Sequence, residues 1–177
     1  MKKFISIIGI IITFFIIYFL QVNFFNWFNI AGIKPNLFVM LILFIGLFAG
    51  KKYGIVFGFL LGIYLDLLVA KTVGFSGILY AIVGFLAGYF EKTFSKDSKI
   101  TIILMVIGST VFYEVLFYLY NILKFSGTLE ILIFLKILLI ELLFNSLITI
   151  IIYPLIQKFG YAIENVFKES KLLTRYF

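Results

Sequence analysis

Long apolar runs separated by short polar stretches are the dominant pattern of the chain. Six such runs can be distinguished, at residues 4–25, 36–50, 54–70, 74–90, 100–123 and 129–156. A helix that crosses the hydrocarbon core of a bilayer, roughly 30 Å thick, needs about 20 predominantly apolar residues. Backbone polar groups in lipid must pair within the protein, and helices achieve this within one segment. The pattern therefore predicts an all-helical integral membrane protein with six transmembrane helices in one domain, residues 1–177.

Near the C-terminus, charged residues begin to interrupt the apolar pattern. Phe159, Ile163 and Phe167 recur at helical spacing among lysine and glutamate residues. A helix with one apolar and one charged face is suited to the headgroup layer of a membrane. We therefore expect a short amphipathic helix within residues 157–177, and Pro154 is expected to kink or terminate the sixth span.

Lysine and arginine residues concentrate on one side of the six predicted spans. With a cytoplasmic N-terminus, eleven of them fall in cytoplasmic segments and three fall outside, namely Lys34, Lys71 and Lys124. Cytoplasmic segments of membrane proteins are enriched in these residues, so the distribution predicts that both termini are cytoplasmic. On that side we expect a tight turn at residues 50–53 and a solvated connector at residues 91–99.

Composition agrees with a membrane location and argues against several kinds of site. Hydrophobic residues make up 64% of the chain and charged residues 13%, too little polar material to cover a water-soluble globule. The absence of cysteine and histidine removes thiolate chemistry and the commonest metal ligand and general base. We therefore expect no enzyme activity and no cofactor or metal. The net charge of +7 is attributed to helix orientation and anionic lipids rather than nucleic acid.

The third and fourth spans carry rows of glycines at helical spacing, namely Gly54, Gly58 and Gly62 in the third and Gly77, Gly84 and Gly88 in the fourth. Such rows allow helices to approach closely within a membrane. They serve either to pack the two spans against each other or to form a groove for the helix of a partner protein.

Asp66 follows the last glycine of the third span by one helical turn. An ionised carboxylate in lipid is costly, so this side chain is expected to face a helix interface, water or a cation. It acts either as an acceptor for backbone N–H groups at residues 71–74, where the fourth helix begins, or as a contact for a partner or ligand.

Further intramembrane polar residues lie in the fifth and sixth spans, namely Glu114, Lys136, Glu141 and Asn145. If these spans form an antiparallel hairpin, Glu114 and Lys136 fall at similar depth, which allows an ion pair. Glu141 and Asn145 are four residues apart and share one helix face. These residues either join helices, within the chain or to another subunit, or mark a transport or proton path.

An ordered series of motifs fills residues 34–90. It consists of Lys34-Pro35-Asn36, an apolar span, a glycine-rich turn with basic residues, a GxxxGxxxGxxxD pattern that ends at Asp66, and a second glycine-rich helix. This series resembles the rod shape-determining MreD family. The resemblance implies a non-catalytic scaffold in the bacterial cytoplasmic (inner) membrane that binds MreC directly. Through MreC, it would link MreB filaments to peptidoglycan synthesis by RodA and a class B penicillin-binding transpeptidase.

MreD proteins are also similar to the substrate-binding components of energy-coupling-factor vitamin transporters, which are small six-helix membrane proteins. Such a component usually docks its energising subunit through a row of small residues on the first helix. Residues 4–20 contain only Ser6, Gly9 and Thr13 as small residues, which argues against this function. It remains the alternative to the scaffold.

Overall fold

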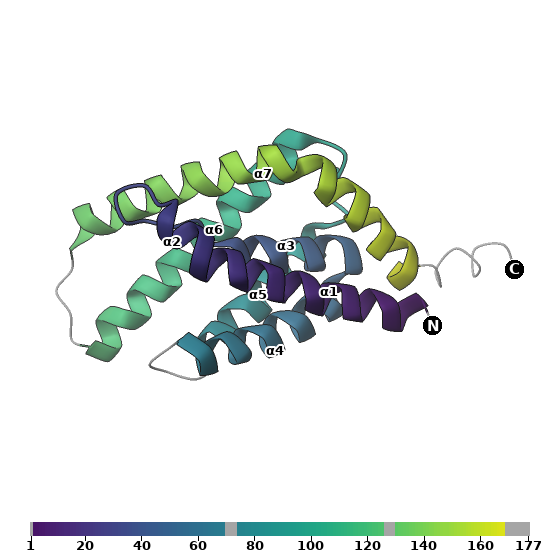
Figure 1. The fold of residues 1–177 in the computed structure, drawn as a ribbon, viewed down its shortest axis with the longest axis horizontal. Helices are drawn as coiled ribbons and strands as arrows, with labels where there is room; N and C mark the ends of the chain where they lie inside the picture. The colour runs from purple at the N-terminus through teal and green to yellow at the C-terminus, as the bar shows by residue number, and fades with distance from the viewer. Residues whose placement is uncertain (1, 70–73, 126–129, 169–177) are drawn as a thin grey trace, which may run out of the picture.

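The computed structural model describes residues 2–69, 74–125 and 130–168, most of which are helical (Figure 1). Helix α1 (Lys2–Phe19) continues through a π-helical turn, η1 (Leu20–Phe24), into the short helix α2 (Phe25–Trp27). The other helices are α3 (Leu37–Ala49), α4 (Lys51–Val69), α5 (Phe75–Phe90), α6 (Lys99–Phe125) and α7 (Ile131–Lys168). Strand-like pairing among the described residues is limited to one isolated bridge between Ile30 and Ile33. The predicted all-helical fold is confirmed.

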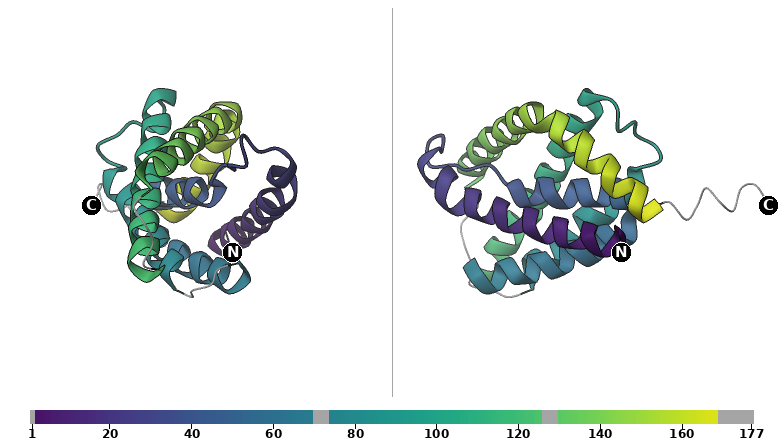
Figure 2. Two further views of the ribbon diagram at one scale, coloured as in Figure 1. Left: turned by 90° about the vertical axis from the view of Figure 1, so that its left-hand side faces the viewer. Right: turned by 45° about the vertical axis from the view of Figure 1, so that its right-hand side comes forward.

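Helix α3 lies at the centre of the bundle. All of its 13 residues are buried except Phe44. It contacts α1, α4, α5, α6 and α7, and Figure 2 shows it surrounded by other helices. A helix that is apolar on every side is suited to such a position. At 1.5 Å per residue it is only about 20 Å long, so it does not reach across a full hydrocarbon core.

Helices α3, α4 and α5 follow one another through short connections and pack together. Gly50 alone separates α3 from α4, and its φ of 92° lies in the left-handed region that favours glycine. The turn predicted at residues 50–53 is therefore present, but it is shorter than expected. Lys51 and Lys52 already belong to the first turn of α4.

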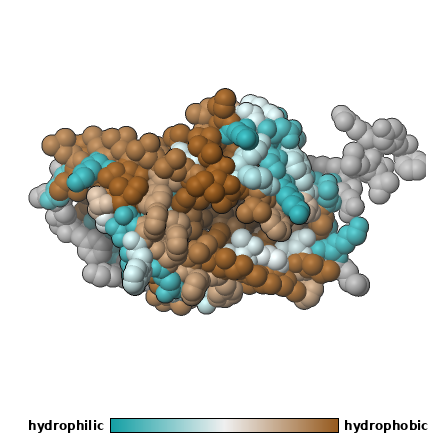
Figure 3. Space-filling model, turned by 45° about the horizontal axis from the view of Figure 1, so that its top comes forward, coloured by the Kyte–Doolittle hydropathy of each residue, from teal (hydrophilic) through white to brown (hydrophobic). Residues whose placement is uncertain are grey.

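The outer surface of the bundle is strongly apolar. Three helical stretches are long and apolar enough to cross a membrane, namely Lys2–Trp27, Lys99–Lys124 and Ile131–Lys168, and α3 and α5 are shorter apolar helices. Large apolar side chains such as Phe19 and Leu132 are exposed, and apolar residues cover much of the face shown in Figure 3. Water-soluble proteins rarely expose apolar surface on this scale, so lipid is the medium that suits it.

Helix α7 is 38 residues long and contains Pro154 in its interior. Proline lacks the N–H that would bond four residues back, and its ring crowds the preceding turn, so it bends a helix. Figure 1 shows such a bend in α7. Pro154 therefore kinks the sixth predicted span without ending it.

The segment after the bend is helical up to Lys168, and part of it packs onto the bundle. Gly160 lies against the ring of Phe48 in α3, and Phe167 contacts Tyr53 in α4 with ring centroids 4.3 Å apart. Ile163 and Phe167 of the predicted apolar face therefore pack against the bundle, whereas Phe159 is exposed on its surface. Residues 169–177 of the predicted tail lie outside the described residues.

Candidate functional site

The two glycine rows face each other across the α4–α5 interface. A Cβ atom built on Gly58 would lie 2.6 Å from the carbonyl carbon of Tyr80, and one built on Gly62 would lie 2.5 Å from the Cα of Gly77. Real Cβ atoms essentially never approach other atoms this closely. The backbones of α4 and α5 are therefore in direct contact, as small-residue packing in membranes allows.

Gly84 lies where three helices meet. A Cβ on Gly54 of α4 would be 2.8 Å from the Gly84 carbonyl carbon, and one on Gly46 of α3 would be 3.1 Å from the same atom. Gly88, one turn further along α5, lies against the backbone of Lys51. All six predicted glycines thus make contacts within the chain. This agrees with packing of the two spans against each other, the first of the two alternatives, rather than with an open groove for a partner's helix.

Asp66 connects the end of α4 to the start of α5. Its Oδ2 atom accepts hydrogen bonds from the backbone N–H of Gly74, at 2.8 Å, and of Ser76, at 3.0 Å. Gly74 is the N-cap residue of α5, with a φ of 102°, and contributes no side-chain cap of its own. The first N–H groups of a helix have no partner within the helix. Asp66 is only 2% exposed and supplies the missing acceptor from the neighbouring helix.

The start of α3 is capped by side chains from three parts of the chain. Asn36, the N-cap residue, accepts a hydrogen bond from the N–H of Val39 at 3.2 Å. The N–H of Leu37 donates to Gln21, at 3.3 Å. The N–H of Asn36 donates to Oδ1 of Asn145, at 2.9 Å. Asn145 is 14 residues, or roughly 21 Å, into α7, so α3 begins deep inside the bundle.

Polar side chains of α6 and α7 continue from this cap. The amide of Asn145 donates to Thr110 at 2.9 Å, and the Asn36 amide donates to Glu114 at 3.4 Å. Glu141, one turn before Asn145 on the same face of α7, is buried. Glu114 follows Thr110 by one turn on the antiparallel helix α6, so the contact between Asn145 and Thr110 places the two glutamates side by side. Three of the predicted polar residues, Glu114, Glu141 and Asn145, are therefore brought together.

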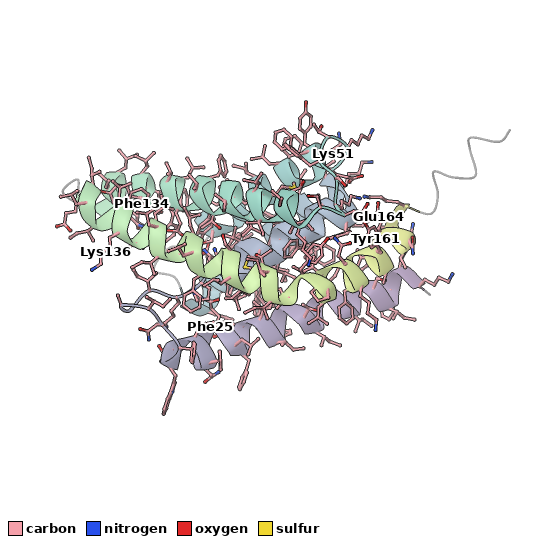
Figure 4. The ribbon with its side chains drawn as sticks, turned by 90° about the horizontal axis from the view of Figure 1, so that it is seen from above. Phe25, Lys51, Phe134, Lys136, Tyr161 and Glu164 are labelled. Carbon is pink, nitrogen blue, oxygen red and sulfur yellow. The ribbon has the colours of Figure 1, made fainter. Side chains whose placement is uncertain are left out.

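Lys136 does not belong to this cluster. No ion pair joins it to Glu114 in the described part of the chain, and its side chain is exposed (Figure 4). The reason is the helical period, because five residues turn the helix by about 140° between Lys136 and Glu141. Since Glu141 faces α6, Lys136 points elsewhere, and the ion pair that the sequence allowed is absent.

A second polar network ties residues 91–98 to the end of α7 (Figure 4). Lys96 pairs with Glu164 at 2.6 Å, and Lys168 pairs with Glu91 at 2.8 Å and with Glu164 at 3.1 Å. Burial lowers the pKa of Lys96 below its ordinary value, and the Glu164 carboxylate acts in the opposite direction. The segment predicted as a solvated connector is therefore held against the bundle.

Side-chain and backbone hydrogen bonds strengthen the same attachment. The amide of Gln157 donates to the Lys96 carbonyl, while the hydroxyl of Tyr153 donates to the Asp97 carbonyl at 2.6 Å and that of Tyr161 to the Asp97 carboxylate. These contacts are not among those predicted from the sequence. The sequence feature that could have predicted these contacts is the polar face of residues 153–168, which lies at helical spacing opposite the apolar face.

Gln21, Asn36 and Thr110 are further members of the interior network that the sequence did not single out. Gln21 lies near the end of the first apolar run, residues 4–25, and Asn36 belongs to the Lys34-Pro35-Asn36 motif, and neither position by itself indicates a cap. Their polarity within or beside apolar runs is the sequence feature that could have predicted their place in the interior network. Within residues 2–69, 74–125 and 130–168, no group of three potential metal-ligating side chains is present. The arrangement is thus built to hold helix ends inside an apolar bundle.

Comparison with known proteins gives a family assignment. Searches of curated proteins and of solved structures each returned no match. The similarity to energy-coupling-factor transporter components therefore has no support from solved structures. By contrast, the family model described as rod shape-determining protein MreD matches residues 1–162, which is most of the chain. The chain therefore belongs to the MreD family of rod shape-determining membrane proteins.

Proposed function

We propose that this protein is a non-catalytic, multi-pass scaffold of the bacterial cell-elongation machinery in the cytoplasmic (inner) membrane. The match to the MreD family over residues 1–162 is the observation that carries this proposal. That family determines rod shape and is not known as an enzyme family, so the expected activity is positional rather than chemical.

In the proposed orientation, the six predicted spans lie within the membrane, α3 reaching only part of the way across it, and both termini lie in the cytoplasm. Support comes from the end of the bundle that carries Lys51, Lys96 and Lys168, because the described N-terminal residues lie at the same end (Figures 1 and 4). Basic residues on that side agree with the positive-inside rule. The first turn of α4, with Lys51 and Lys52 exposed, would face anionic lipid headgroups there.

We further propose that the protein binds MreC directly and, through it, joins MreB filaments to RodA and a class B penicillin-binding transpeptidase. Helix-to-helix contact within the membrane is the expected mode, because the described connections between helices are short. The glycine rows and the Asp66 carboxylate are engaged within the chain. Partner contact therefore falls to the exposed apolar faces of the helices.

The buried polar residues support a structural role for the interior. Asp66 caps α5, and Gln21, Asn36 and Asn145 cap α3. Each of these groups stabilises a helix end that would otherwise leave backbone N–H groups unpaired in an apolar medium. A rigid bundle with fixed outer faces is what a scaffold requires.

Co-purification tests the proposed partner. A tagged copy of the protein, extracted from its source cells in mild detergent, should recover MreC, and a chemical cross-linker should trap the two as one species. The matched control is an unrelated tagged membrane protein of similar size. Recovery of a bound vitamin without MreC would contradict the scaffold and favour the transporter component instead.

A further inference from the structure

Two carboxyl groups meet beside the start of helix α3. Asn145 of α7 donates to Thr110 of α6 at 2.9 Å, and one turn further along these antiparallel helices the register places Glu141 of α7 beside Glu114 of α6. Glu141 is only 5% exposed, and its Oε1 atom is buried without a hydrogen-bond donor among the described residues. Ionised carboxylates only accept hydrogen bonds, so two of them cannot bond to each other directly. Side by side in an apolar interior, the pair requires a positive charge that neutralises one of the two carboxylates.

Neighbouring amides and phenols supply dipoles but no positive charge. The Asn36 amide donates to Glu114 at 3.4 Å, whereas the Asn145 amide donates to Thr110. From α5, the titratable side chain nearest the pair is Tyr80, whose ring stacks on that of Tyr113 of α6 at 4.9 Å. A phenol is neutral or negative, so neither ring can neutralise a second carboxylate.

The charged residues of the other helices do not compensate the pair. Helix α3 contains no titratable residue. Asp66 of α4 is negative when ionised and is engaged with the start of α5. Lys136 of α7 is exposed and makes no ion pair with either glutamate in the described part of the chain. Helix α1 contributes lysines only at its first turn, at the opposite end of the bundle.

We propose that Glu114 and Glu141 form a proton-binding site that holds one shared proton at neutral pH. The proton comes from water and forms a hydrogen bond between a carboxylic acid and a carboxylate. Two neighbouring like charges in a medium of low dielectric are strongly unfavourable, and one proton removes this repulsion. The remaining negative charge lies next to Asn36, the N-cap residue of α3, where the helix dipole favours an anion.

A proton fits this site better than a metal cation does. The amide oxygen of Asn145 already accepts from the N–H of Asn36, and the Asn145 amide donates to Thr110. A metal ion would need several free oxygen ligands, and sodium or calcium would have to compete for these groups. A proton needs only the two carboxyl groups that the helix register places side by side.

Infrared spectroscopy with ¹³C-labelled glutamate carboxyl groups tests this proposal on the full chain in lipid nanodiscs at neutral pH. The wild type should show the carbonyl stretch of a protonated carboxylic acid, shifted by the label. Glu141→Gln and Glu114→Gln should each abolish this band, because the new amide donates to the remaining carboxylate. Glu130→Gln, at an exposed position before α7, should retain the band in full.

Several outcomes would overturn the proposal. Absence of the acid band in the wild type would do so, as would its survival in both single variants. A rise in thermal stability with sodium or potassium that Glu141→Gln abolishes would assign the site to a metal cation. Each glutamine mimics the neutral acid, so both variants should fold as judged by circular dichroism, and failure of both to fold would also count against a shared proton.

Discussion

Removal of the Asp66 carboxylate should destabilise the isolated protein, which the loss of a partner contact would not do. Its Oδ2 atom accepts from the N–H groups of Gly74 and Ser76 at 2.8 and 3.0 Å. Asp66→Ala deletes the acceptor and leaves two N–H groups at the start of α5 without it, that of Ser76 buried and that of Gly74 partly buried. Asp66→Asn keeps one oxygen with two lone pairs in the same place, so it preserves the geometry but loses the charge.

The magnitudes follow from the two hydrogen bonds. A buried donor left without an acceptor costs about 1–3 kcal/mol and a partly buried one costs less, so Asp66→Ala should reduce the free energy of unfolding by about 2–4 kcal/mol. Charge-assisted hydrogen bonds exceed neutral ones by roughly 1 kcal/mol each, so Asp66→Asn should cost about 2 kcal/mol. Glu130→Gln serves as a control and should stay near wild type, because Glu130 is exposed.

Thermal unfolding of the three variants in detergent micelles, followed by circular dichroism and by size-exclusion chromatography, measures this order directly. The expected ranking of stability is Glu130→Gln above Asp66→Asn above Asp66→Ala. An Asp66→Ala protein that unfolds at the wild-type temperature, and that fails only to recover a partner, would refute the capping role.

Three further predictions concern packing and charge. Gly84→Ala directs a methyl group at the backbone of Gly54 and should cost about 1–3 kcal/mol of unfolding free energy. The control variant Gly108→Ala places its methyl group in open space and should not lower stability. Thermal unfolding compares the two variants. Glu164→Gln removes the ion pairs with Lys96 and Lys168 and should cost about 1 kcal/mol, read out as faster proteolysis of residues 91–98, and an unchanged cleavage rate would contradict this. Lys136→Glu should not rescue Glu114→Lys in an expression assay, because the two side chains do not meet; full rescue would restore the ion-pair hypothesis.

The sequence predicts well those features that depend on local spacing. The positions and lengths of the apolar runs predict where the helices lie along the chain, since a span must contain enough apolar residues. The row of glycines ending at Asp66 predicts close helix packing and a cap at the next helix start. Both follow from steric size and from the missing hydrogen-bond partners of a helix end, which depend little on the rest of the fold.

Features that depend on how each helix is rotated cannot be obtained in this way. In lipid, interior and exterior faces are both apolar, so the composition of α3 does not distinguish a central helix from a peripheral one. The same ambiguity allowed an ion pair between Glu114 and Lys136, which lie at similar depth but face different directions. Only the packing of α7 onto α6 shows that Glu141 takes the inner position.

The attachment of residues 91–98 was missed for a different reason. Proline near the end of an apolar run was expected to kink or terminate a helix, and α7 kinks there but continues. This continuation carries Glu164 and Lys168 back toward the loop. The charges of Glu164 and Lys168 could not by themselves indicate the contact with residues 91–98, because it depends on the direction of the helix after Pro154.

Depletion of the protein in its source cells tests the central claim most directly. We predict that rod-shaped cells become round as the protein disappears, and that wild-type protein and the Glu130→Gln variant restore rods. Gly84→Ala and Asp66→Ala should restore shape less well, in proportion to their loss of folded protein. Depleted cells that keep a normal rod shape and width would contradict a role in shape determination.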